Sequence, residues 1–156
     1  MYFCKRILTV KKMLHKKFVP FDIAKKLKEN GFRDKCIATY DKFSTFSFNY
    51  EVSNEEVDVT NLEYSHNSSD SGIWIDAPMI SQVLDWLRKK GLSVEVSYLF
   101  TELDLWTFEI KHMGSCFTSY DDKEYTSHAD AENAAIEFAL DNIVSKQNEN
   151  ENGQGD

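Results

Sequence analysis

Apolar residues recur at helical spacing in three stretches of the chain. The first covers about residues 20–30 and ends at Gly31, where a left-handed residue can stop a helix. The second covers residues 78–90 and ends at Gly91, and the third covers residues 127–144. In each stretch the apolar side chains gather on one side of the expected helix. The pattern therefore predicts three amphipathic helices.

The second stretch carries the clearest helix-end signals in the sequence. Pro78 suits a first helical turn, and Asp76 just ahead of it is a plausible cap. The basic residues 88–90 lie where the helix dipole is negative, and Gly91 follows them. Trp86 falls on the apolar face, so we interpret it as a core residue. Every conspicuous residue of this stretch thus has a structural role.

Alternating apolar and polar residues predict strands between the helices. The predicted strands are residues 36–40, 43–52, 92–99, 103–112 and 115–120. The first two form a hairpin with its tip at Asp41 and Lys42, and the last two a hairpin whose turn is residues 113–115. Residues 53–72 permit a further short strand or a loop. We therefore predict an α+β fold with a mainly antiparallel sheet of five or six strands and three helices packed on one face.

The two ends of the chain differ from the part between them. Residues 1–18 place apolar side chains on one side and lysines on the rest, which predicts a basic amphipathic arm. Residues 146–156 contain no apolar side chain, which predicts a disordered polar tail. Residues 19–145 are long enough and apolar enough for one α+β domain. The sequence contains no apolar run long enough for a membrane span or an export signal, so we expect a cytoplasmic protein.

Charge is distributed unevenly along the chain. Residues 1–17 contain six basic residues and no acidic one, whereas the whole chain of 156 residues has a net charge of −8. The remaining residues therefore carry −14, and so acidic a body repels phosphate chains. Nucleic-acid association is accordingly expected only through the basic arm, where the candidate residues are Lys11, Lys12, Lys16 and Lys17.

Cysteine and histidine spacing gives one weak candidate for catalysis. The three cysteines are scattered, which suits thiols in a reducing compartment, and no pair of cysteines or histidines has metal-ligand spacing. We expect no metal and no cofactor. Cys116 and His112 flank the Gly114 turn, and a thiol beside an imidazole is the beginning of a nucleophilic pair. This pair, in a hydrolase-like enzyme, is the catalytic alternative.

The order of the predicted elements resembles that of a nucleic-acid-binding fold. Residues 78–144 run helix, three strands, helix, as in the double-stranded RNA-binding domain. That family places lysines at the start of its last helix, whereas this chain has "SHADAEN" there. Acidic side chains at that position repel the phosphate backbone, so the resemblance extends to topology alone.

A second resemblance covers roughly residues 20–145. The segments "IAKKLKENGF", "CIATYD", "APMISQVLDWLRKKGLSVEVSY" and "YTSHADAENAAIEFALDNI" resemble small uncharacterised proteins of phages and prophages of Bacteroides and related gut bacteria. The resemblance implies a mobile-element origin and an accessory or partner-binding role, with no catalytic residues to transfer.

We therefore expect a non-enzymatic accessory protein that binds another macromolecule, most plausibly a protein. It would use a sheet face, a sheet edge or the basic arm. The oligomeric state is left open. Aromatic residues on the predicted strands are the candidate contacts: Phe46, Phe48, Tyr50, Trp106 and Phe108.

Overall fold

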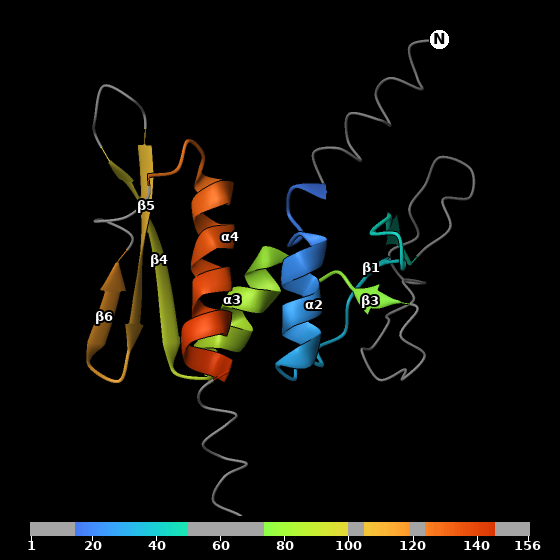
Figure 1. Cartoon of the computed structure of the whole chain (residues 1–156), viewed down its shortest axis with the longest axis horizontal. Helices are drawn as coiled ribbons and strands as arrows, with labels where there is room; N and C mark the ends of the chain where they lie inside the picture. Colours follow the sequence, from blue (N-terminus) through green and yellow to red (C-terminus); the bar gives the residue numbers. More distant parts are fainter. Residues whose placement is uncertain (1–14, 50–73, 100–104, 119–123, 146–156) are drawn as a thin grey trace, which may run out of the picture. The chain divides into compact units, whose positions relative to one another are not determined.

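The computed structural model describes residues 15–49, 74–99, 105–118 and 124–145 (Figure 1). The chain divides into two compact units, Met1–Met79 and Ile80–Asp156. Each unit contains α-helix and antiparallel sheet, which confirms the α+β class.

The first predicted helix lies in unit 1. Helix α2 spans Phe21–Glu29 and buries Ile23, Ala24 and Leu27, the three apolar residues that recur at helical spacing. Gly31 has a φ of +85°, the left-handed conformation predicted for the residue that stops this helix. The backbone N–H of Phe32 then donates to the carbonyl of Leu27 at 2.9 Å, which turns the chain back toward the sheet.

The sheet of unit 1 has three short antiparallel strands in the order β2-β1-β3. They are β1 (Ala38–Tyr40), β2 (Phe46–Phe48) and β3 (Ile75–Asp76). The hairpin of β1 and β2 was predicted, but its connection covers residues 41–45 rather than Asp41 and Lys42 alone, so β2 begins three residues later than predicted. The central strand β1 is buried at all three positions, because it has a strand on each side.

Unit 2 contains the other two predicted helices and the longer strands. Helix α3 spans Ile80–Lys89 and is followed by β4 (Leu92–Leu99), β5 (Leu105–His112) and β6 (Ser115–Thr118). The chain ends in α4 (His128–Ala139), which continues as the π-helical turn η2 (Leu140–Val144). Ser127 caps α4 by accepting a hydrogen bond from the Asp130 N–H at 3.2 Å, as its position predicts.

Helices α3 and α4 cover one face of the β4-β5-β6 sheet (Figure 1). Because side chains alternate along a strand, Phe108 and Ile110 of β5 lie on the face that α4 covers, where Phe108 contacts Phe138 at a ring separation of 6.1 Å. The small residues Ala131, Ala135 and Ala139 of α4 are fully buried, which permits the helix to approach the sheet closely.

The prediction of one sheet of five or six strands was wrong. The described strands form two three-stranded sheets, and only α3 and α4 belong to the unit that contains β4. The cause is β3, which pairs with β1 and leads directly into α3. Asp76 is correspondingly a buried strand residue rather than a helix cap, and α3 begins at Ile80, beyond Pro78.

Several predictions fall outside the described residues. These are the structure of residues 1–14 of the basic arm, the path of residues 53–72, the position of Tyr50 and the tail 146–156. Within the described part of the chain, no helix is long and apolar enough to cross a membrane.

Candidate functional site

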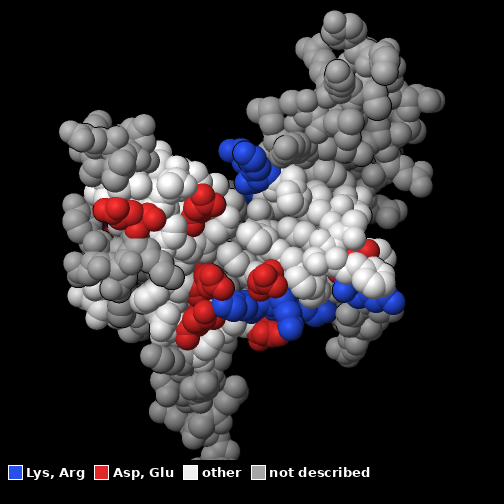
Figure 2. Space-filling model, turned by 45° about the horizontal axis from the view of Figure 1, so that its top comes forward, with Lys and Arg blue, Asp and Glu red and all other residues white. Residues whose placement is uncertain are grey.

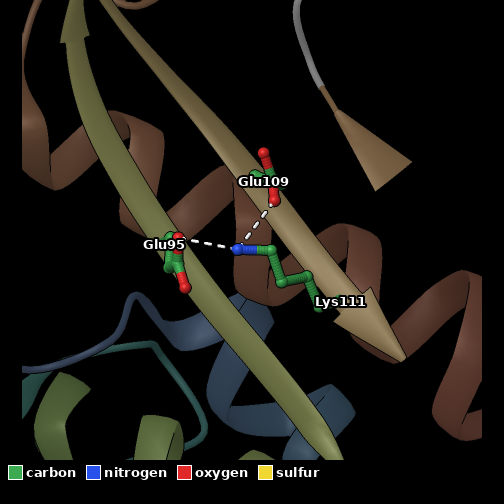
Figure 3. A network of polar contacts seen from close by, with 3 residues as sticks. All are labelled: Glu95, Glu109 and Lys111. Atoms are coloured by element: carbon green, nitrogen blue, oxygen red, sulfur yellow. Dashed lines mark hydrogen bonds and ion pairs between the residues drawn. The ribbon is translucent and has the colours of Figure 1, made fainter. Parts of the chain in front are cut away.

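The face of the unit 2 sheet opposite α3 and α4 carries a small network of charged side chains (Figure 3). Lys111 of β5 lies with its Nζ 3.0 Å from Glu109 Oε1 and 3.1 Å from Glu95 Oε2 of β4. All three side chains are well exposed to solvent, so water screens their attraction. Exposed pairs of this kind add little to stability, and the network mainly fixes where these side chains point.

Mutual contacts shift the pKa values of this network in the directions expected for ion pairs. The hydrogen bond from Lys111, followed by that of Cys116, lowers the pKa of Glu109. The hydrogen bonds to Glu109 and then Glu95 raise the pKa of Lys111. Both groups therefore stay charged at neutral pH, and neither is prepared for proton transfer.

Cys116 lies beside this network and away from His112. In the register of β5 and β6, Cys116 is opposite Lys111, and His112 is opposite Ser115. Residues that follow one another in a strand point to opposite faces of the sheet, so Cys116 and His112 lie on different faces. The sequence predicted that this hairpin could bring the two side chains together, and the observed register does not.

A two-residue turn explains this separation. Met113 and Gly114 have φ values of +46° and +80°, as in the tight turns that favour hairpins, and Ser115 is already paired with His112. The predicted turn of residues 113–115 would have placed Cys116 opposite His112 instead. A shift of one residue reverses the face on which a side chain lies.

The environment of Cys116 also disfavours a reactive thiolate. Desolvation, followed by the hydrogen bond with Glu109, raises the pKa of the thiol. Cys36 of unit 1 is fully buried, and burial followed by the charges of Asp76 and Asp34 raises its pKa to about 12. Both residues are thiols held in their protonated form, which is the unreactive one.

The described residues also offer no candidate site for a metal ion. No three side chains of histidine, cysteine, aspartate or glutamate in that part of the chain lie close enough together to hold an ion.

The predicted aromatic contacts of unit 1 form a half-buried cluster. Phe18 packs edge-on against Phe46 and Phe48, with ring centroids 5.0 and 5.6 Å apart, and Tyr40 contacts Phe46 at 5.5 Å. Phe46 and Phe48 are partly exposed, whereas Phe18 and Tyr40 are buried. This cluster is the outer layer of the unit 1 core rather than a flat exposed patch.

The predicted aromatic contacts of unit 2 differ from each other in exposure. Phe108 is 5% exposed and belongs to the core under α4. Trp106 is partly exposed, and its ring lies between Tyr98 at 5.1 Å and His128 at 4.9 Å. His128 in turn pairs with Glu132 at 3.1 Å. Of these two residues, Trp106 is therefore the more exposed to solvent.

Three large apolar side chains outside the predicted set are the most exposed ones among the described residues. They are Phe43 at 74% exposure, Trp74 at 49% and Met113 at 86%. Phe43 lies in the turn between β1 and β2, Trp74 immediately precedes β3, and Met113 is in the turn between β5 and β6. The sequence contained a signal for Met113, a large apolar residue inside a predicted turn, whereas Phe43 was predicted to lie in a strand.

Strand β4 forms a long edge of the unit 2 sheet. It pairs with β5 over eight residues, from Leu92 opposite His112 to Leu99 opposite Leu105. Among the described strands it has no second partner, because the order of the sheet is β4-β5-β6. The other edge strand, β6, is only four residues long, and Tyr125 forms a bridge with Trp106 of β5 beyond it.

The predicted basic contacts are only partly described. Lys16 and Lys17 are exposed, and Lys11 and Lys12 lie outside the described residues. In the view of Figure 2, basic and acidic side chains gather in small groups on the described surface, and neither sign covers it as one continuous patch.

Comparisons of the chain with protein-family profiles, with curated proteins and with solved structures found no match.

Proposed function

We propose that the chain is a non-enzymatic accessory protein that binds another protein by adding a strand of its partner to the β4 edge. The observation that carries this proposal is the eight-residue length of β4, with a paired neighbour on one side only among the described strands. Such an edge presents a row of backbone N–H and C=O groups that an extended segment of another chain can pair with.

The composition of β4 supports this use of its edge. Natural proteins protect long edges with proline, lysine or a bulge, and Leu92–Leu99 contains neither proline nor lysine and pairs with β5 without interruption. Glu95 is its one charged residue, and its carboxylate is held in an ion pair with Lys111 of the neighbouring strand. The edge thus lacks the devices that would repel an added strand.

The setting of the protein is part of the same proposal. The resemblance of residues 20–145 to phage and prophage proteins supports an accessory role in a mobile element, in the cytoplasm of the host. The free cysteines Cys36 and Cys116, which form no disulfide, suit that reducing compartment. The enzymatic alternative at Cys116 and His112 receives no support from the register of β5 and β6.

Lysine substitutions along the edge test the proposal. Ser93 and Ser97 of β4 alternate with the core-facing residues, so Ser93→Lys/Ser97→Lys adds two charges to this edge without disturbing the core. The matched control is Ser115→Lys, which adds a charge to the short edge strand β6. The tagged proteins are used to capture partners from host cells, and amide hydrogen exchange then maps the contact.

We expect the wild-type protein and Ser115→Lys to capture the same partner, with added protection of β4 amides in the complex. We expect Ser93→Lys/Ser97→Lys to fail to capture this partner, because edge lysines oppose strand addition. Capture that survives the double substitution, or protection confined to other elements, would contradict the proposal.

A further inference from the structure

Several exposed groups lie at the end of the unit 1 sheet where β1 finishes and where β2 and β3 begin. The three residues of this last row of the sheet are Tyr40, Phe46 and Ile75. Tyr40 pairs with Phe46 on one side and with Ile75 on the other. The turn that follows Tyr40 and the residue that precedes Ile75 therefore lie at the same end of the sheet. That turn carries Phe43, and the residue before Ile75 is Trp74.

Two large aromatic side chains are thus displayed to solvent at this end. Phe43 is 74% exposed and Trp74 is 49% exposed. The turn that holds Phe43 is well ordered, because Asp41 Oδ1 accepts hydrogen bonds from the N–H groups of Phe43 and Thr45, each at 2.8 Å. The ring of Phe43 is therefore presented on a fixed backbone.

Lysine side chains accompany these rings. Lys28 donates from its Nζ to the carbonyl oxygen of Trp74 at 3.4 Å, and the Nζ of Lys42 lies 4.9 Å from the centroid of the Phe43 ring. The acidic side chain of this turn, Asp41, is directed into the turn by its two hydrogen bonds. The groups exposed to solvent at this end therefore include aromatic rings and lysine ammonium groups.

The end of the basic arm reaches the same row. The ring of His15 contacts the ring of Phe46 at 4.5 Å, edge to face, and Phe46 is the β2 residue of that row. Lys16 and Lys17 follow His15 and are exposed. We call Lys16, Lys17, Lys28, Lys42, Phe43 and Trp74 the aromatic-basic end of unit 1.

The described residues that build this end are basic on balance. Residues 15–49 contain 8 basic and 4 acidic residues, a net charge of +4. Unit 1 as a whole has 12 basic and 11 acidic residues and unit 2 has 6 and 15, so most of the net acidity that opposes nucleic-acid binding belongs to unit 2. A basic region joined to exposed aromatic rings is the combination used to bind single strands.

We propose that the aromatic-basic end of unit 1 binds single-stranded nucleic acid, with bases stacked on Phe43 and Trp74 and phosphates near the four lysines. Stacking needs flat exposed rings and accepts any base, so the interaction is sequence-tolerant. Double-stranded nucleic acid hides its base faces and has no corresponding contact here. These residues belong to unit 1 and the β4 edge belongs to unit 2, so different substitutions test the two proposals and either can fail without the other.

Fluorescence anisotropy with a labelled thymidine oligonucleotide tests the proposal on the full chain. Four variants are compared with the wild-type protein. Phe43→Ala/Trp74→Ala removes the stacking rings, and its control Met113→Ala removes the exposed apolar side chain of unit 2. Lys28→Ala/Lys42→Ala removes two charges, and its control Arg88→Ala/Lys89→Ala removes two from α3. Circular dichroism checks that each variant is folded.

We expect the wild-type protein to bind the oligonucleotide and to bind it more weakly as salt increases. We expect Phe43→Ala/Trp74→Ala to weaken binding at least about tenfold, Lys28→Ala/Lys42→Ala to weaken it and reduce its salt dependence, and both controls to bind like the wild type.

Three results would overturn the proposal. The first is absence of binding by the wild-type protein at low salt. The second is equal affinity for a duplex of the same length, or binding that survives loss of both rings, since either would show that stacking contributes nothing. The third is tighter binding of a poly-glutamate peptide that shows the same sensitivity to the variants, which would assign this end to acidic protein segments.

Discussion

The register of β5 and β6 determines which side chains lie beside Cys116, and so whether its thiol can be activated as a nucleophile. A nucleophilic thiol needs a base or a positive environment that favours the thiolate. Cys116 lies opposite Lys111, but Glu109 accepts from both side chains and offsets the lysine. His112, the base that could have activated the thiol, lies on the other face of the sheet. The residue types of a catalytic pair are present here without the geometry.

Replacement of Glu109 tests this description of Cys116. The carboxylate raises the pKa of the thiol, so Glu109→Gln lowers that pKa and increases the fraction of thiolate at a given pH. Mass spectrometry follows the modification of Cys116 by iodoacetamide at a series of pH values. We expect the rise of the modification rate with pH to occur at a lower pH in the variant than in the wild type.

Glu95→Gln is the control, because Glu95 raises the pKa of Cys116 less than Glu109 does. An unchanged profile in Glu109→Gln, or a shift to higher pH, would be inconsistent with a thiol held protonated by this carboxylate. Cys36 provides an internal reference, since its burial leaves it unmodified in the folded protein.

The functional residues were predicted less completely than the elements that carry them. Phe46 and Phe48 were identified as aromatic strand residues, yet their exposure depends on Phe18, which reaches them from a distant part of the sequence. Trp74 was missed because its exposure depends on the start of β3, a strand only two residues long. Neither dependence is encoded in the neighbouring residues.

Helix ends are the best-predicted features at the scale of secondary structure. The ends of α2 and α3 at stop glycines and the start of α4 lie where they were predicted, because such signals act within a few residues of themselves. The start of α3 was predicted too early, since Asp76 belongs to β3. Gly31 and Gly91 both adopt the positive φ that their positions predict. The partners of each strand were predicted less well, because pairing is decided by segments that are distant in sequence.

Substitution of Gly91 measures the contribution of one stop glycine. A Cβ at this position would meet no other atom within 4 Å, so the effect of Gly91→Ala comes from its φ of +81° alone. We expect Gly91→Ala to lower the free energy of unfolding by about 1–2 kcal/mol in urea titrations.

Gly91→Asn is the matched variant, because asparagine tolerates the left-handed conformation better than alanine. We expect it to destabilise the protein less. Equal stabilities of Gly91→Ala and the wild type would show that α3 does not need a left-handed residue at its end.

The chain divides into two α+β units, and in the described residues each unit has its own three-stranded sheet. The α+β class follows from the order of local patterns along the chain, and it was predicted. The number of sheets depends on whether β3 joins β1 or a later strand, and a two-residue strand carries too little pattern to decide this. Its pairing with β1 closes the first sheet before α3 begins.

The proposed activities belong to surfaces of different units. In unit 2 the helices cover one face of the sheet, which leaves the β4 edge as the longest backbone surface for another chain. In unit 1 four described lysines, Lys16, Lys17, Lys28 and Lys42, accompany two exposed aromatic rings. Neither surface requires a reactive side chain, so both agree with the protonated thiols and the charged network described above.

Amide hydrogen exchange of the free protein, followed residue by residue by nuclear magnetic resonance, shows whether the β4 edge is open. Alternate N–H groups of an edge strand point away from the sheet. We predict that alternate amides of β4 exchange rapidly, whereas those of β5 at residues 109–112, which have β4 and β6 on either side, exchange slowly. Uniform slow exchange along β4 would show that this edge is already paired and would contradict the proposal.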